Sequence, residues 1–366
     1  MYDNIRPLFD TELPEALEKI VSSPLFAPIA AFVYPGEPIA SVAGRLRSIP
    51  DIHTLQDTVM RTALDRIMAL SVTDFTHSGT DFIVPGKPYL FISNHRDITL
   101  DAFLLQYLVF SYNDLYITFG ANLMQDPVVT LIGRANRMFR VERGGTPKDF
   151  YHNMMQVSSY IRQVIVGDKH SVWIAQRNGR TKDGLDRTEV SLLKMLGLSG
   201  HSTSKAPLAP LKALNIVPVS ISYEWEPCDL LKARELRLRD AGPYKKSAGE
   251  DLNSVLTGIM QPKGHVHLSI TAPVTDEEID RCSATDGPFE NLAALIDRRI
   301  STAYRLHPTN YVAYDMLHHT SRFADHYSPT LRRQFAERLA LAADEEKNIF
   351  LDIYSHPVER CYPGLI

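Results

Sequence analysis

The sequence predicts an α/β fold in which a mixed, largely parallel sheet is flanked by helices, with a helical N-terminal region and a helical C-terminal tail. Two observations predict it. Between residues 76 and 306, segments of strand character alternate with segments of helix character. The strand candidates are nearly continuous apolar runs, which is typical of strands in a sheet that is covered on both faces.

The N-terminal region, residues 1–75, has the apolar periodicity of helices. Residues 12–23 repeat leucine and isoleucine at helical spacing, and residues 54–71 gather apolar side chains on one face of a further helix. The sequence "YPGEP", at residues 34–38, is a turn signal between the two. We therefore predict a helical region that packs on the rest of the chain.

The central part of the chain, residues 76–306, alternates between strands and helices. A short strand from residue 81 is expected before a Pro-Gly turn and a buried strand at Tyr89–Ser93. Further strands are predicted at 114–123, 138–143, 171–176, 215–225 and 264–274. Helices are predicted at 99–112, 126–137, 146–168, 187–200 and 286–305. Thr146 fits the cap of the helix at 146–168, and Gly167 fits its end.

The tail, residues 307–366, is amphipathic and predicts helices packed on the central domain. No internal repeat or low-complexity linker marks a boundary in the chain. We place three parts at residues 1–75, 76–306 and 307–366, of which the middle one is the α/β domain.

Composition excludes several classes of protein. The apolar share of 44% and the charged share of 22% are ordinary for a globular chain, and the net charge of −4 argues against a nucleic-acid-binding protein. Cys228, Cys282 and Cys361 are odd in number and far apart, which favours free thiols in a reducing compartment. His265 and His267 share one strand face without an evident third ligand, so no metal site is predicted.

The N-terminus lacks the basic start and apolar core of a signal peptide. No run reaches the roughly 20 apolar residues that a membrane-spanning helix needs. We therefore expect a chain that is soluble or attached to a membrane surface.

A polar cluster interrupts two apolar runs within residues 89–110. It contains His95, Asp97 and Asp101 at a predicted strand-to-helix junction. A histidine can take a proton from a hydroxyl nucleophile when a carboxylate holds its other ring nitrogen, and either aspartate fits that part. The structural alternative is a helix cap formed by Asn94 or Asp97, with His95 as a neighbour whose hydrogen bonds are satisfied.

The segment "NHRDITLD", residues 94–101, resembles the signature of the glycerolipid acyltransferase superfamily, which includes lysophosphatidate and glycerol-3-phosphate acyltransferases. The family motif is Asn-His, four residues and then Asp at a strand-to-helix junction. The resemblance implies His95 as general base and Asp101 as the carboxylate that orients it, with Asp97 as the alternative. Five residues separate His95 from Asp101, so we expect a one-residue bulge at the start of the helix.

Three further blocks follow in the family's order within residues 91–223. The segment "MFRVERGG" resembles the block Phe-Ile-Asp-Arg, with Arg143 in the place of the arginine. The segment "WIAQRNGRTKDG" resembles the block Phe-Pro-Glu-Gly-Thr-Arg-Ser, and Gly179, Arg180 and Thr181 match its second half. The segment "NIVPVSISY" resembles the fourth block, a strand that contains Val-Pro-Val.

The third block departs from the family at a glutamate that is associated with positioning the acceptor. Residues 176–178 are Gln-Arg-Asn, where the family has Pro-Glu-Gly. Arg177 and Arg180 bring planar guanidinium groups that suit phosphate or carboxylate oxygens, and Gly179 allows close backbone approach. We interpret this loop as an anionic head-group site to which Arg143 contributes; a solvated turn is the structural alternative.

The resemblance implies transfer of a fatty acyl group from acyl-CoA or acyl-carrier protein to the hydroxyl of a glycerol-phosphate or lysophospholipid acceptor, as in phospholipid biosynthesis. The acyl carrier is then a co-substrate, and no other cofactor is expected. Asn94, Arg96 and Thr181 complete the expected substrate-binding residues, and the first two, with backbone amides, are candidates for stabilising the oxyanion.

Two alternatives remain open at this point. The altered third block favours an acyltransferase for a non-phosphate or amine-bearing lipid acceptor. The shifted spacing between His95 and Asp101 favours a catalytically inactive homologue that binds a lipid or an acyl carrier.

A lipid acceptor implies a membrane surface as partner. We expect a cytoplasmic protein that is peripherally associated with the inner face of the membrane. The helix at 98–112 and the side chains of Phe26, Phe32 and Tyr34 are candidates for that contact, with burial in the core as the favoured interpretation for most of them.

Overall fold

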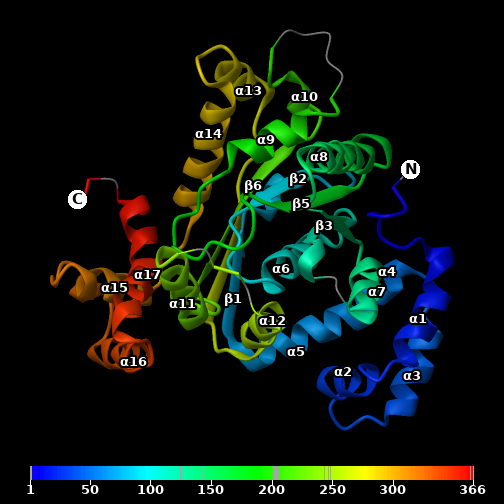
Figure 1. Ribbon diagram of the computed structural model, residues 1–366, viewed down its shortest axis with the longest axis horizontal. Helices are drawn as coiled ribbons and strands as arrows, with labels where there is room; N and C mark the ends of the chain where they lie inside the picture. Colours follow the sequence, from blue (N-terminus) through cyan, green and yellow to red (C-terminus); the bar gives the residue numbers. More distant parts are fainter. Residues whose placement is uncertain are drawn as a thin grey trace.

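The computed structural model describes residues 2–123, 126–142, 144–200, 206–242, 244–245, 247, 249–362 and 364–365. Within these residues one seven-stranded sheet has the order β1-β7-β6-β2-β5-β3-β4 (Figure 1). Its strands are β1 (Val72–Ser78), β2 (Leu90–Ser93), β3 (Leu115–Gly120), β4 (Met138–Val141), β5 (Ser171–Ala175), β6 (Ile216–Tyr223) and β7 (Gly264–Ile270).

Every neighbouring pair of these strands is parallel except β6 and β7, which are antiparallel. The mixed, largely parallel sheet and its flanking helices confirm the predicted fold class. The helices are α1 (Leu13–Val21), α2 (Phe26–Val33), α3 (Ile39–Arg47), α4 (Ile52–Leu55), α5 (Arg61–Ser71), α6 (Leu100–Val109), α7 (Pro127–Ala135), α8 (Pro147–Arg162), α9 (Val190–Gly197), α10 (Ala209–Lys212), α11 (Asp229–Asp240), α12 (Glu250–Met260), α13 (Asp276–Ser283), α14 (Pro288–Ala303), α15 (Pro308–Leu317), α16 (Pro329–Leu339) and α17 (Lys347–Cys361).

Both faces of the sheet are covered, which explains why its central strands read as continuous apolar runs. Leu90 and Ile92 of β2 join a core with side chains of α8, α9 and α14. Phe91 of the same strand joins the core on the other face, with side chains of α5 and α6. Alternate residues of one strand therefore build two cores.

The first strand differs from the prediction. Residues Thr80–Phe82 form a 3₁₀ turn instead of a strand, and the strand is β1, which begins directly after α5 and pairs with β7. Gly79 ends it with a φ of +79°, and a Cβ at this position would lie 1.8 Å from the carbonyl oxygen of Ile270. Edge position and half-exposed side chains explain why β1 lacks an apolar pattern.

The predicted long helices are present. A π-helical turn at Gln56–Met60 joins α4 to α5, and another at Gln163–Gly167 continues α8. Thr146 caps α8 with a reciprocal hydrogen-bond pair to Asp149, and Asp51 caps α4 by accepting from the amide of Thr54. Local capping residues thus fix these helix starts.

Two helices that were not predicted, α11 and α12, follow β6. The buried face of α11 includes Asp229, Lys232 and Glu235 besides Ala233, so it lacks the apolar stripe of an ordinary amphipathic helix. Helix α11 packs against α17, and Figure 1 shows α15–α17 gathered beside it, at the opposite end of the molecule from α1–α3. The division of the chain at residues 75 and 306 stays a prediction.

No single described helix combines the length and apolarity needed to cross a bilayer, although the segments Asp10–Val21 and Phe26–Val33, bent by 99° at their junction, meet both requirements when taken together.

Candidate active site

The polar segment of interest is the loop Asn94–Thr99, at the carboxyl end of β2. Strand β2 pairs in parallel with β5 on one side and β6 on the other, so the carboxyl ends of three strands meet at this edge, where open α/β sheets bind ligands. Helix α6 begins at Leu100. The loop absorbs the extra residue, and Asp101 enters the first turn of α6.

His95 and Asp101 are in direct contact. Nδ1 of His95 lies 2.8 Å from Oδ2 of Asp101. The same oxygen accepts hydrogen bonds from the amides of Arg96 at 2.5 Å and Asp97 at 3.0 Å. A carboxylate that accepts from several donors acts as an acceptor toward the imidazole too, so we assign the proton of this contact to Nδ1. Nε2 of His95 is then left with a free lone pair.

Asp97 has a different task. Its Oδ1 accepts from the amides of Thr99 and Leu100, both at 2.8 Å, and so caps the start of α6. Its Oδ2 is buried without a hydrogen-bond partner and faces α12, where a Cβ on Gly258 would lie 2.7 Å from it. The contact to His95 is therefore made by Asp101, and Asp97 forms the cap that the structural alternative foresaw.

Tyr223, at the end of β6, completes the surroundings of Asp101. Its hydroxyl donates to Oδ1 of Asp101 at 2.6 Å. Burial, together with the charge of Asp101, raises the pKa of the Tyr223 hydroxyl well above its ordinary value, so the hydroxyl keeps its proton and stays a donor. Tyr223 was not predicted from the sequence. The signal that could have indicated it is its position at the end of a predicted strand, two residues after Ile221 and therefore on the same face of that strand.

His95 is also held from the side of β5. The ring of Trp173 meets the imidazole edge to face, with 5.4 Å between ring centroids, and its Nε1 donates to Ser93 at 2.8 Å. The amide of Thr181 donates to the carbonyl oxygen of His95 at 2.7 Å. The side chain of His95 is 13% exposed and that of Asp101 is 1% exposed, so the imidazole is the member of the pair that a substrate can reach.

Asn94 does not face a substrate. It is fully buried, its Oδ1 accepts from the amide of Ile221 at 2.8 Å, and its Nδ2 donates to the carbonyl of Ile221 and to Asp186. These bonds tie the end of β2 to β6. The expectation that Asn94 binds substrate is wrong, because the side-chain amide is used inside the protein.

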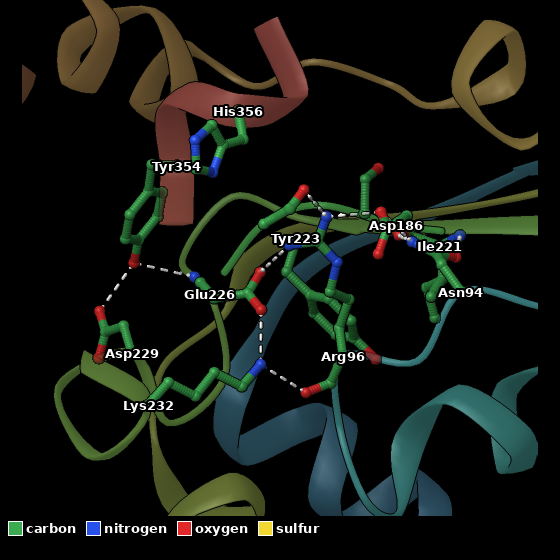
Figure 2. Close-up of polar contacts among 12 residues, drawn as sticks. Asn94, Arg96, Asp186, Ile221, Tyr223, Glu226, Asp229, Lys232, Tyr354 and His356 are labelled. Atoms are coloured by element: carbon green, nitrogen blue, oxygen red, sulfur yellow. Dashed lines mark hydrogen bonds and ion pairs between the residues drawn. The ribbon is translucent and has the colours of Figure 1, made fainter. Parts of the chain in front are cut away.

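Arg96 is likewise committed to the interior. Its Nη2 lies 2.6 Å from Oδ2 of Asp186, and its Nη1 lies 3.2 Å from Oε2 of Glu226 (Figure 2). Burial acts to lower the pKa of Arg96, but the charges of Asp186 and Glu226 raise it well above its ordinary value. We correct the expectation that this guanidinium contacts substrate or oxyanion, since it neutralises two buried carboxylates. The amides of Arg96 and Asp97 point to Asp101 and are not oxyanion donors either.

The basic loop after β5 lies beside His95 but is only partly free. Arg177 is half-buried and engages the carbonyl of Leu185 at 3.4 Å and Asp183 at 3.6 Å. Arg180 is buried next to Cys228, and its Nη1 has no hydrogen-bond partner in the part of the chain that the structure describes. Burial raises the pKa of the Cys228 thiol, while the charge of Arg180 acts in the opposite direction.

Other atoms of this loop also lack partners. The hydroxyl of Thr181 and both amide atoms of Gln176 are buried without a hydrogen bond to any described residue. Gly179 has a φ of +79°, and a Cβ there would meet nothing within 4 Å, so open space lies in front of it. The remaining predicted head-group residue, Arg143, lies outside the described residues.

The histidines of β7 belong to a separate cluster. His265 and His267 both contact Oγ1 of Thr76 at 2.7 Å, and His307 contacts Ser222 at 3.2 Å. Burial lowers the pKa of His267 to about 4 and the pKa of His307 to about 3. Among the described residues, no group of three or more His, Cys, Asp or Glu side chains is arranged to hold a metal ion.

The segments considered for membrane contact are mostly inside the protein. Seven of the ten residues of α6 are buried, including Asp101 and Gln106. Phe26 is buried, and Phe32 and Tyr34 are half-buried. Burial is therefore the role of most residues of the helix at 98–112, as the favoured interpretation expected, and contact of this helix with a membrane stays a prediction.

Comparison with known proteins finds similarity in the central part of the chain. Residues 74–222 match the family model described as Acyltransferase. No curated protein matches the chain. A solved structure that is similar is the 1-acyl-sn-glycerophosphate (LPA) acyltransferase PlsC from Thermotoga maritima, with 13% sequence identity over 80% of this chain and 92% of that chain and a TM-score of 0.39. The family match contains His95 and Asp101 and ends one residue before Tyr223.

Proposed function

We propose, from the match of residues 74–222 to the family model described as Acyltransferase, that the protein transfers a fatty acyl group to the hydroxyl of a glycerol-phosphate or lysophospholipid acceptor. Acyl-CoA or acyl-carrier protein is the donor in this proposal. The observation that carries it is the 2.8 Å contact between Nδ1 of His95 and Asp101, which leaves Nε2 available as a general base.

The chemistry follows from that arrangement. Nε2 of His95 takes the proton of the acceptor hydroxyl while the oxygen attacks the carbonyl carbon of the donor thioester. Asp101 stabilises the imidazolium that forms. When the tetrahedral intermediate collapses, the C–S bond breaks and the imidazolium returns the proton to the leaving thiolate. The acceptor itself is the nucleophile, so no acyl-enzyme is required.

The loop after β5 supports an anionic acceptor. Arg180 offers a buried guanidinium whose Nη1 is unpartnered, and Thr181 offers an unpartnered hydroxyl. Buried polar atoms without partners are rare in native proteins and mark places where a ligand or water supplies the missing bond. We assign the acceptor phosphate to this loop.

The test is an acyl-transfer assay with purified protein. Palmitoyl-CoA or palmitoyl-carrier protein is offered as donor, with glycerol-3-phosphate, lysophosphatidate and other lysolipids as acceptors. We expect ester formation with a phosphate-bearing acceptor and its loss in His95→Ala. Equal transfer by His95→Ala and wild type would refute the proposed base.

A second acceptor class is favoured by one observation. Arg177, which stands where the family has the glutamate, is already engaged by Asp183, and its neighbour Gln176 is neutral. Arg177 is therefore not a free cation for a phosphate. A non-phosphate or amine-bearing lipid acceptor is therefore the alternative, and faster turnover of such an acceptor than of lysophosphatidate would select it.

We further propose that the lipid acceptor is met at a membrane surface on the cytoplasmic side. Residues 20–36 contain no charged side chain, and Leu25 and Ile29 of this segment are exposed. Burial of such side chains in the interface between lipid head groups and acyl chains is favourable. In co-sedimentation with phosphatidylglycerol vesicles, Leu25→Glu/Ile29→Glu is expected to bind less than wild type, and equal binding would exclude this contact.

A further inference from the structure

A closed ring of buried polar contacts lies behind the His95–Asp101 pair. We propose that Lys232 and Glu226 are positioning residues for this pair and act through the peptide group between Arg96 and Asp97. The inference rests on the proposed function of His95 as a base. It assigns a role to residues of α11 and its preceding turn, which lie beyond the segment that matches the acyltransferase family.

The ring has three members. Nη1 of Arg96 contacts Oε2 of Glu226 at 3.2 Å, and Oε1 of Glu226 contacts Nζ of Lys232 at 2.6 Å. Nζ of Lys232 then donates to the main-chain carbonyl of Arg96 at 2.8 Å (Figure 2). The side chain and the carbonyl of one residue are therefore clamped by one pair of opposite charges.

The clamped carbonyl belongs to the peptide group whose amide holds Asp101. That amide is the N–H of Asp97, which donates to Oδ2 of Asp101 at 3.0 Å. A peptide group is planar, so fixing its oxygen also fixes the direction of its N–H. Lys232 on one side and Asp101 on the other thus bind opposite ends of a single rigid unit. The same Oδ2 contacts His95, so the clamp sets the oxygen that orients the imidazole.

The ring is buried and its charges are balanced. The side chains of Lys232 and Glu226 are 1% and 3% exposed. Asp186 supplies the second negative charge for Arg96, so two cations face two carboxylates. Balanced, fully desolvated charges hold a geometry tightly, because any displacement leaves a charge unpaired in the interior.

The C-terminal helices hold the ring in place. The hydroxyl of Tyr354 on α17 accepts from the amide of Glu226 at 3.0 Å and donates to Asp229 at 2.7 Å. Arg338 on α16 pairs with the same aspartate at 2.5 Å. Helix α17 also packs on the loop that carries Asp186, since a Cβ on Gly184 would lie 2.4 Å from the carbonyl oxygen of Ile353. The tail therefore supports the catalytic loop.

The deciding variant is Glu226→Gln/Lys232→Met, which removes one charge of each sign and leaves Arg96 paired with Asp186. We expect kcat for acyl transfer to fall about 10- to 100-fold with KM for the acceptor within about threefold, because small misplacements of catalytic groups affect the transition state most. A kcat within about twofold of wild type in folded protein overturns the proposal.

A double-mutant cycle separates positioning from a general structural defect. If the clamp acts through Asp101, adding Glu226→Gln/Lys232→Met to Asp101→Asn lowers kcat by less than about twofold further, because the carboxylate it positions is already absent. A full additional loss in the Asp101→Asn background contradicts the proposal.

The control is a matched pair elsewhere. Arg299 pairs with Glu278 at 2.7 Å and also donates to the main-chain carbonyl of Ala272, which reproduces the chemistry of the clamp between α13 and α14. Glu278→Gln/Arg299→Met is expected to lower the melting temperature and leave kcat unchanged. An equal loss of kcat in this control contradicts a specific role for Lys232.

Two further measurements cover the cases of misfolding and of a failed function. Tyr354→Phe keeps every charge, and we expect kcat to fall by roughly two- to fivefold, again without further loss in Asp101→Asn.

If wild type transfers no acyl group, the proposed function fails. The Nδ1–H proton resonance of His95, assigned by its loss in His95→Ala, then decides: an unchanged downfield position in Glu226→Gln/Lys232→Met overturns the inference, and its loss or movement supports it.

Discussion

Asp101 and the loop after β5 lie beyond the carboxyl ends of two neighbouring strands, β2 and β5, and are built in opposite ways. The carboxylate of Asp101 accepts from His95, two main-chain amides and Tyr223. In the loop after β5, buried polar atoms have no partner among the described residues. These unpartnered atoms belong to Gln176, Arg177, Arg180 and Thr181.

The difference separates two requirements of one site. Groups that orient a base must be rigid before the substrate arrives, and saturating their hydrogen bonds makes them so. Groups that bind a substrate must have unused hydrogen-bonding capacity, which costs stability until a ligand occupies it. In the proposed function, the carboxylate of Asp101 meets the first requirement, and the loop after β5 meets the second.

The largest effect is expected from Asp101→Asn compared with Asp97→Asn. Asp101→Asn replaces the acceptor of Nδ1–H by an amide, and general-base catalysis is worth about 10²- to 10⁴-fold, so kcat should fall by that order. Asp97→Asn keeps a capping oxygen and is expected to change kcat less than about threefold. Steady-state acyl-transfer kinetics measure both, and the opposite ranking would reassign the orienting carboxylate to Asp97.

The next effect concerns the β5 end. Arg180→Met removes a guanidinium whose Nη1 is unpartnered, and hydrogen bonds to charged groups are worth about 1.5–3 kcal/mol, so KM for a phosphate-bearing acceptor should rise about 10- to 100-fold. We expect kcat at saturating acceptor to change little. Arg187, which is exposed in the same loop, provides the control Arg187→Met. Loss of kcat with an unchanged KM would move Arg180 from substrate binding to the catalytic step.

A smaller effect is expected when the carboxylate of Asp101 loses one of its hydrogen-bond donors. Tyr223→Phe removes the hydroxyl that donates to Oδ1 at 2.6 Å and leaves the contact of Oδ2 with His95. We expect kcat to fall by roughly 5- to 20-fold and the free energy of unfolding to fall by about 1 kcal/mol, a typical net value for one hydrogen bond. An unchanged kcat would show that the contacts of Asp101 with His95 and with the two main-chain amides are enough to orient its carboxylate.

The smallest effect on activity at neutral pH, but a clear one on stability, is expected from the histidines near β7. The pKa values of His267, about 4, and His307, about 3, are lower than in the unfolded chain, so the unfolded chain binds more protons as the pH falls. Their contribution to stability is complete above pH 6.5, the ordinary value for histidine, and is lost as the pH falls toward 4. Urea unfolding at a series of pH values measures this loss.

The variant His267→Gln/His307→Gln provides the comparison for that series. It should show a shallower loss of unfolding free energy between pH 6.5 and 4 than wild type. The same loss in both proteins would show that other groups govern acid unfolding.

Local sequence signals predicted much of the fold. Continuous apolar runs located the central strands, and Thr146 and Gly167 marked the ends of a long helix that the structure contains. The strand β1 and the helix α11 were not found. The strand lies at the sheet edge with half of its surface exposed, and the helix buries Asp229, Lys232 and Glu235 where an amphipathic pattern requires apolar residues.

The site was predicted in the same uneven way. The motif in residues 94–101 identified His95 and both candidate aspartates, because these residues are close in sequence and share one strand-to-helix junction. Asn94 and Arg96 were expected to face the substrate and instead face inward. Their hydrogen-bond partners, Asp186, Ile221 and Glu226, lie about 90–130 positions away in the chain.

The sequence by itself determined the fold class and the placement of His95 at a strand-to-helix junction, because strand periodicity, helix caps and a short motif are all set by neighbouring residues. Only the tertiary structure decided which carboxylate contacts His95, which arginine side chains are paired inside the protein, and which residues hold the loop Asn94–Thr99. Those outcomes depend on burial and on ion pairs between distant segments, such as Arg96 with Glu226 and Glu226 with Lys232. The sequence alone does not show whether a charged side chain is solvated or is paired with a buried charge, and only the fold determines which of the two occurs.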